Sequence, residues 1–153
     1  MGKIDKTFAL ILILVMVISG ASLIAFLPKA LAQSGTTVTG IIYSDTTWTQ
    51  ANSPYSLTGP VSVNSGATLT IESGVTINLG NYYLEVNGTL RAIGNSNNIN
   101  FIGGRMIFSQ PSTSWNAQTG SGCIIENAVL SSDIEMWTAS PNINNNTINN
   151  IIE

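Results

Sequence analysis

Short runs of alternating apolar and polar residues dominate the chain after residue 60. Each run is three to five residues long and apolar at every second position, which is the pattern of a β-strand with one buried face. The apolar positions are Val61, Val63, Leu69, Ile71, Val75, Ile77, Leu79, Leu84, Val86, Leu90, Ala92, Ile99 and Phe101. Glycine and asparagine separate the runs, as they do at turns. After residue 32 no comparable window shows a helical apolar face, so the sequence predicts an all-β domain.

Recurrences along the chain predict how these strands are arranged. Ser65–Leu69 recurs as Ser73–Ile77 at a spacing of 8, which is the distance from one short strand to the next around a corner. Val63–Leu69 recurs in Val86–Leu90 at spacings of 23 and 21, which suit a full coil of three short strands. A β-sandwich also has a strand every 8–12 residues or so, but it does not explain the longer recurrence.

The C-terminal residues repeat at a third spacing. Cys123–Glu135 matches Pro141–Glu153 at a distance of 18, with four of thirteen positions identical. The related pairs are Ile125 with Ile143, Asn127 with Asn145, Leu130 with Ile148, Ile134 with Ile152 and Glu135 with Glu153. Such a repeat indicates a solenoid, in which like residues of successive coils lie about 4.8 Å apart. We expect Asn127 and Asn145 to stack at a turn and to hydrogen-bond through their amides.

These patterns resemble those of a known family. Val61–Gly94 looks like the opening coils of exported right-handed parallel β-helix proteins of bacteria and archaea, and Asp45–Gly59 resembles their entry segment. Ile143–Asn150 is similar to the Asn-rich repeats of the NosD-like and carbohydrate-binding/sugar-hydrolase group within the pectate-lyase-like superfamily. The resemblance implies a right-handed parallel β-helix. It implies no single activity, because that superfamily includes lyases, hydrolases, adhesins and surface-layer proteins.

The first 32 residues are typical of an export signal. Lys3 and Lys6 precede Phe8–Leu27, which is twenty residues without a charge, and Ala30-Leu31-Ala32 follows. The small residues Ala30 and Ala32 predict cleavage before Gln33. The alternative is an uncleaved membrane anchor, because about 20 apolar residues can span a bilayer. We therefore expect a signal or anchor (1–32), an entry and capping segment (33–60) and coils (61–153) that continue beyond the C-terminus. Trp48 and Tyr55 are expected to cover the first coil.

Composition excludes several functions. Charged residues are 8% of the chain, against roughly 25% in typical globular proteins, and 17 asparagines make the surface polar without charge. From Gln33 onward the chain has two basic residues, Arg91 and Arg105, and seven acidic residues, which gives a net charge of −5. Nucleic-acid binding needs clustered cations and is rejected. The chain has no histidine, which excludes the catalytic triads and metal sites that use imidazole. The single cysteine, Cys123, is expected to be buried.

Few residues are candidates for chemistry. Asp133, Glu135 and Glu153 could hold a cation such as Ca²⁺, or they are solvated side chains. Trp115, in the long loop Ser109–Gly122, could stack on a sugar ring, or it folds back over the coils. Asn87 and Asn145 match the N-glycosylation pattern. Arg91 alternates with Leu90 and Ala92 in an ordinary outward strand position, and Arg105 has no acid near it in sequence, so no catalytic set is predicted.

The expected function follows from these limits. The sequence favours an exported cell-surface or secreted module with a structural or adhesive role, whose partner is a polysaccharide or cell-surface glycan and which needs no cofactor. It contacts a membrane only if residues 1–32 are retained. The alternative is the N-terminal piece of a polysaccharide lyase or glycoside hydrolase whose catalytic coils lie beyond Glu153. A NosD-like role in copper maturation finds no set of metal ligands in the sequence.

Overall fold

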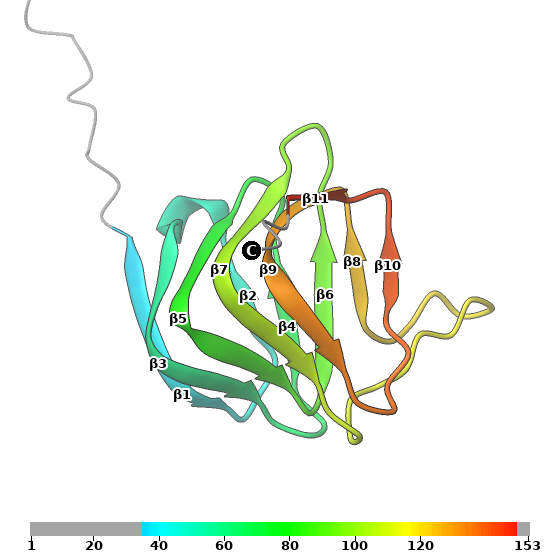
Figure 1. The fold of residues 1–153 in the computed structure, drawn as a ribbon. Helices are drawn as coiled ribbons and strands as arrows, with labels where there is room; N and C mark the ends of the chain where they lie inside the picture. The colour runs from blue at the N-terminus through cyan, green and yellow to red at the C-terminus, as the bar shows by residue number, and fades with distance from the viewer. Residues whose placement is uncertain (1–34, 150–153) are drawn as a thin grey trace, which may run out of the picture. The chain divides into compact units, whose positions relative to one another are not determined.

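The computed structural model describes residues 35–149, which form two parallel β-sheets (Figure 1). Sheet A has six strands in the order β1-β3-β5-β7-β9-β11, and sheet B has five in the order β10-β8-β6-β4-β2. Odd-numbered strands lie in sheet A and even-numbered strands in sheet B, so the chain passes from one sheet to the other at every turn. This interleaving is typical of a β-solenoid, and it confirms the predicted all-β class and the stacking of coils.

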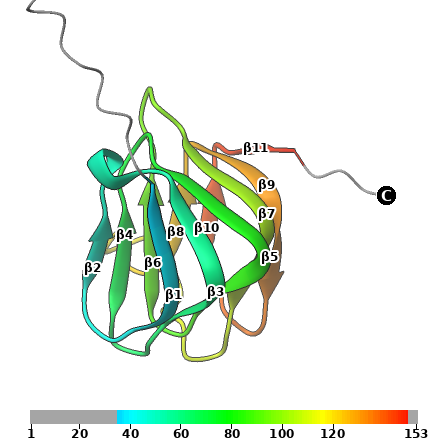
Figure 2. The same cartoon turned by 90° about the vertical axis from the view of Figure 1, so that its left-hand side faces the viewer.

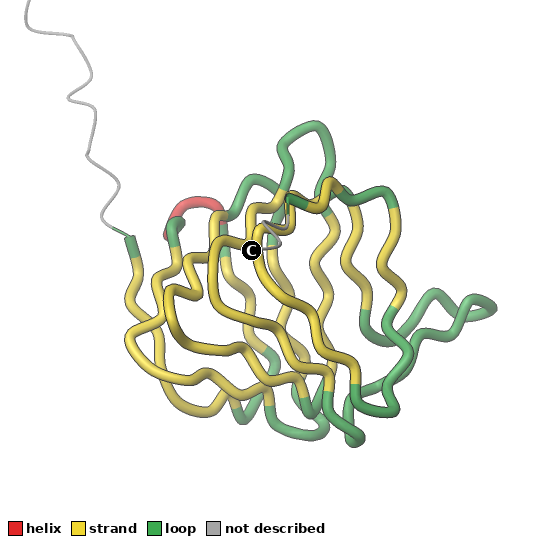
Figure 3. Tube along the Cα trace, viewed as in Figure 1, coloured by secondary structure: helices red, strands yellow, loops and turns green. Residues whose placement is uncertain are grey.

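The strands of the two sheets differ in length. Sheet A contains β1 Thr36–Ile42, β3 Tyr55–Val63, β5 Thr76–Val86, β7 Ile99–Phe108, β9 Ala128–Met136 and β11 Thr147–Ile148. Sheet B contains β2 Thr46–Trp48, β4 Thr68–Ile71, β6 Thr89–Ile93, β8 Ile124–Glu126 and β10 Asn142–Asn144. A 3-10 turn, η2 Gln50–Asn52, lies between β2 and β3 (red in Figure 3). Between residues 35 and 149 no helix is long and apolar enough to cross a membrane.

The strand registers explain the sequence recurrences. Every strand pair is parallel, and the pairing joins residues that the recurrences had matched. The matched pairs are Val63 with Val86, Leu69 with Leu90, Ile125 with Ile143 and Leu130 with Ile148. The spacing of 8 joins β4 to β5 and therefore one sheet to the other (Figure 2). The recurrences near 18 and 21–23 are thus the number of residues from one position to the equivalent position in the next coil.

Each coil has two strands, so the expected three short strands per coil are wrong in number. The predicted runs Val75–Leu79 and Leu84–Val86 both belong to β5, which bends between them. Gly80 sits at this bend with a φ of +57°, and Gly103 and Gly104 of β7 have φ values of +66° and +55°. Left-handed glycine turns the backbone at no steric cost, and the register shifts there. The strand therefore changes direction without ending.

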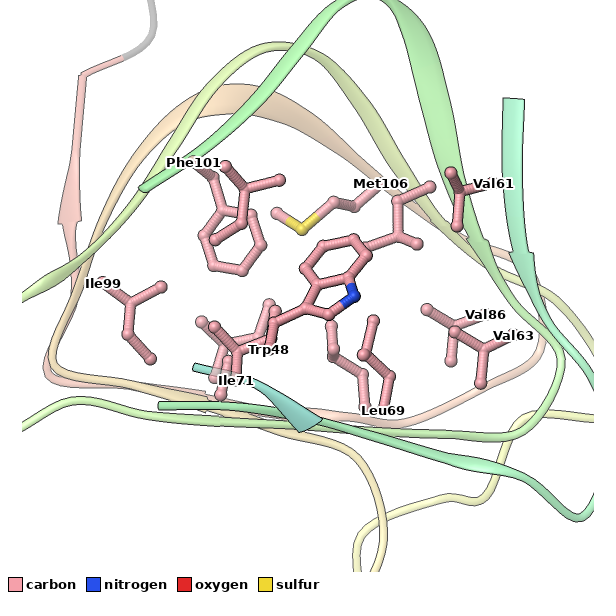
Figure 4. Close-up of a cluster of buried hydrophobic side chains, with 14 of the residues drawn as sticks. Trp48, Val61, Val63, Leu69, Ile71, Val86, Ile99, Phe101 and Met106 are labelled. Atoms are coloured by element: carbon pink, nitrogen blue, oxygen red, sulfur yellow. The ribbon is translucent and has the colours of Figure 1, made fainter. Parts of the chain in front are cut away.

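The interior between the sheets holds one cluster of buried apolar side chains. All the alternating positions predicted to be buried are 2% exposed or less. At the N-terminal end Trp48 and Tyr55, both 4% exposed, stack with ring centroids 4.8 Å apart. Figure 4 shows the indole of Trp48 lying across the core among Leu69, Ile71 and Met106. Both side chains belong to the buried core, and their expected role as a cover over the first coil stays a prediction.

The segment before residue 61 contributes strands of its own. Strands β1 and β2 pair in parallel with β3 and β4, and the boundary expected between residues 60 and 61 falls inside β3. The segment therefore acts as a first coil as well as an entry, because its apolar residues Val38, Trp48 and Tyr55 follow the same inward pattern.

Candidate functional site

The outer face of sheet A brings together polar residues that lie far apart in the sequence. Paired residues of a parallel ladder share a face, and the alternate positions on β5, β7 and β9 are buried. Two outward columns result, Tyr83–Arg105–Asp133 and Glu85–Ile107–Glu135. Every second residue of these strands thus contributes to one outer surface, which is the strongest concentration of charged groups between residues 35 and 149.

Arg105 is the cation at the centre of this surface. Its Nη1 lies 3.0 Å from Oε1 of Glu135, and the two side chains are 54% and 34% exposed. Asp133 lies directly opposite Arg105 in the ladder. Neither acid lies near Arg105 in sequence, because 28 and 30 residues separate Arg105 from these two carboxylates. The long loop before β8 sets that distance, so the 18-residue repeat could not predict this contact.

Glu85 joins a hydrogen-bonded network beside the ion pair. The hydroxyls of Ser62 and Ser109 donate to its two carboxylate oxygens at 3.3 and 3.1 Å. The amide of Asn87 donates to the Ser62 hydroxyl at 3.0 Å. These contacts link side chains from three successive coils. They also engage the amide nitrogen of Asn87 that glycosylation would modify, and its modification stays a prediction.

A depression lies where sheet A bends. It has a volume of about 310 Å³ and is lined by Gly80, Asn81, Tyr82, Gly104, Arg105 and Asp133. Tyr82 is 38% exposed. A Cβ on Gly104 would come within 2.3 Å of the Tyr82 carbonyl oxygen and 2.6 Å of the Leu79 Cβ. The floor of the depression therefore requires a glycine. In the sequence these glycines predict turns, and no sequence pattern indicates the depression between them.

The predicted cation ligands are only partly within the described residues. Asp133 and Glu135 lie on the outer face of β9, whereas Glu153 lies outside residues 35–149. Within that range no cluster of three or more Asp, Glu, His or Cys side chains could hold a metal ion. Glu135 is paired with Arg105 instead. A metal role for these three residues stays a prediction.

Trp115 belongs to a loop that is anchored to the other sheet. Nη1 of Arg91, on β6, donates to the carbonyls of Gly120 and Gly122 at 3.3 and 3.4 Å. The backbone N–H of Trp115 donates to the Ser140 carbonyl at 2.9 Å, and the Trp115 side chain is half-buried. The loop projects from the coils (yellow in Figure 1). Its position favours neither the sugar-stacking nor the covering role of Trp115.

Asn127 and Asn145 form the expected ladder at the turns between the sheets. Both have a φ of +51°. The amide of Asn145 donates to Oδ1 of Asn127, whose own amide donates to the Gly94 carbonyl at 3.0 Å. The predicted turn-stabilising stack is confirmed. The amide nitrogen of Asn145 is engaged in it, and glycosylation there stays a prediction.

Cys123 is buried, as the sequence predicted. It is 1% exposed, and its Sγ accepts a hydrogen bond from the Leu90 backbone N–H at 3.4 Å. Burial raises the pKa of the thiol above its ordinary value of 9.0. This environment disfavours the thiolate and is the opposite of what a nucleophilic cysteine needs.

The remaining candidates and the comparisons add no further site. The predicted cleavage residues Ala30, Ala32 and Gln33 lie outside the described residues. Searches with this chain against protein-family models, curated proteins and solved structures found no match.

Proposed function

We propose that this protein is an exported, right-handed parallel β-helix module with a structural or adhesive role at the cell surface or in the extracellular space. Its outer face contacts a polysaccharide or a cell-surface glycan. The supporting observation is the outer face of sheet A, where an exposed tyrosine, hydrogen-bond donors and the Asp133 carboxylate surround a depression. Binding sites for small ligands combine aromatic side chains with a small number of convergent polar groups.

Export is supported by the sequence of the first 32 residues. The charged start, the uncharged run Phe8–Leu27 and the small residues Ala30 and Ala32 follow the order of a signal peptide. Cleavage would release the coils, and retention would anchor them to a membrane. Right-handed coiling is supported by the strong preference of parallel strands for right-handed connections and by the family resemblance.

The experiment is a binding assay on exported protein. The full chain is expressed in a secreting host, and the released or membrane-held form is tested against insoluble polysaccharides and an array of soluble oligosaccharides. The proposal expects retention by at least one glycan without release of reducing ends or unsaturated products. Mass spectrometry of the N-terminus tests cleavage before Gln33. Absence of glycan binding, or retention of the protein in the cytoplasm, contradicts the proposal.

One observation favours the alternative of a carbohydrate-active enzyme. Asp133 and Glu135 lie beside Arg105 on one sheet face, and a pair of carboxylates is what glycoside hydrolysis uses. Exposure leaves all three groups in contact with water, however, which favours binding over proton transfer. Cleavage of a polysaccharide by the exported protein, lost in Arg105→Gln, would establish the enzyme instead.

A further inference from the structure

We infer that the depression at the bend of sheet A is the saccharide site, and that it takes a neutral sugar ring rather than a uronic acid. The inference rests on the proposed function and adds the location and ligand class that the function leaves open. The site consists of Tyr82, Arg105, Asp133 and Asn81 around the glycine floor.

The shape of the depression comes from backbone geometry. Gly80 and Gly104 line it, and both have left-handed φ values. A Cβ on Gly80 would meet nothing within 4 Å, so the space above this residue is open. The volume of about 310 Å³ lies at the lower end of the range of ligand pockets, roughly 300–1,000 Å³. A hollow of this size accommodates a single ring better than a buried oligomer.

The lining has the groups that a sugar ring needs. A pyranose offers a C–H face and a rim of neighbouring hydroxyls, each of which donates and accepts hydrogen bonds. Tyr82, which lines the depression and is 38% exposed, supplies an aromatic ring for the C–H groups. Arg105 supplies donors, and Asp133, opposite it in the ladder, supplies acceptors. The two side chains are thus placed to hydrogen-bond adjacent hydroxyls.

The charge of the surface selects against uronic acids. Among residues 35–149 Arg105 is the only cation on this surface, and Glu135 already pairs with it at 3.0 Å. Asp133 adds a second carboxylate in the lining and Glu85 a third in the neighbouring column. A ligand carboxylate would therefore meet net negative charge, which costs free energy, whereas a neutral ring meets no such repulsion.

The test uses exported full chain and isothermal titration. The probes are neutral fragments of β-glucan, xylan, mannan and galactan and, for comparison, oligogalacturonate of equal length. The variants are Tyr82→Ala and Asp133→Asn, with Trp115→Ala as the matched control because its loop is anchored to sheet B. We expect a neutral probe to bind, each depression variant to weaken it about tenfold or more, and Trp115→Ala to leave affinity unchanged.

Each of the other outcomes contradicts the inference alone or the inference together with the proposed function. Loss of neutral-sugar binding in Trp115→Ala with full binding by Tyr82→Ala moves the site to the loop, so the inference fails and the proposed function stands. Preferential binding of oligogalacturonate also refutes the inference alone. Binding of no probe by the wild-type protein refutes both. Thermal melting of each variant separates a local effect from unfolding, and Asp133→Asn tests the site by itself if Tyr82→Ala does not fold.

Discussion

Asn127 shows how one side chain stabilises both its own turn and the next coil. Its backbone has a φ of +51°, a conformation that asparagine tolerates better than most residues. Its amide donates to the Gly94 carbonyl of the preceding coil, and its Oδ1 accepts from Asn145 of the following one. Three coils are therefore connected through a single residue. The same residue type at a spacing of 18 was enough to predict this contact, because register and chemistry repeat together.

Substitutions at Asn127 separate the contribution of its amide hydrogen bonds from that of its left-handed backbone conformation. We expect Asn127→Gly to lose only the amide hydrogen bonds, at about 0.5–1.5 kcal/mol each. Asn127→Ala loses the same bonds and also holds a Cβ in the left-handed region, which adds about 1–2 kcal/mol. Urea unfolding of both variants measures the difference. Equal stability of the alanine and glycine variants would show that the backbone conformation at this turn is not under strain.

Arg105 marks the limit of sequence inference at the scale of residues. Its partner Glu135 is 30 residues away, although the sequence repeats lie at 8, 18 and 21–23. The loop between β7 and β8 lengthens this coil and shifts the register by an amount that no repeat records. The burial of each apolar strand position could be predicted because a local pattern determines it. The meeting of polar groups on the outer face could not, because loop length determines it.

At the scale of elements, the bend in sheet A explains why the coil has two strands and a hollow outer face. Paired glycines in β7 and a single glycine in β5 turn adjacent strands at the same level. The hydroxyl of Ser132 on β9 donates to the Gly103 carbonyl at 2.7 Å, which continues the bend without a glycine. From the sequence each glycine predicts a turn that ends a strand. Only the stacking of neighbouring bends shows that the strand continues.

Two glycines of the bend form a matched pair for testing how tightly the bend in sheet A is packed. Gly80 and Gly104 have nearly equal φ values of +57° and +55°, but a Cβ meets open space at Gly80 and the Tyr82 carbonyl at 2.3 Å at Gly104. We expect Gly80→Ala to lower the free energy of unfolding by about 1–2 kcal/mol from conformation alone. Gly104→Ala should lose about 1–3 kcal/mol more from steric overlap.

Chemical denaturation of both variants and the wild type measures these values. Equal losses would mean that the backbone moves enough to accept the methyl group and that the bend is not tightly packed. A greater loss in Gly80→Ala would contradict the described geometry of the bend.

At the scale of the whole molecule, the two ends of the described stack differ. At one end Trp48 and Tyr55 are both 4% exposed and stacked, and the Thr49 N–H donates to the Tyr55 hydroxyl at 2.8 Å. At the other end Ile148 of β11 is 64% exposed and all three residues of β10 are half-buried. A solenoid coil contacts only its neighbours, so its local stability depends on what covers it. The two ends should therefore open with different free energies.

Amide hydrogen exchange tests this difference directly. We expect the amides of β5 and β7 to exchange most slowly, because these two strands lie at the centre of sheet A, farthest from both of its edges. Amides of β10 and β11 should exchange fastest, and those of β2 and the start of β3 at an intermediate rate, because the aromatic stack restrains the N-terminal end. Trp48→Ala should remove that restraint, so that exchange at the N-terminal end approaches the rate at β10 while β7 changes least. Uniform exchange across all the described strands would instead show that the stack opens only as one cooperative unit, and the coils would then not behave as separable neighbours.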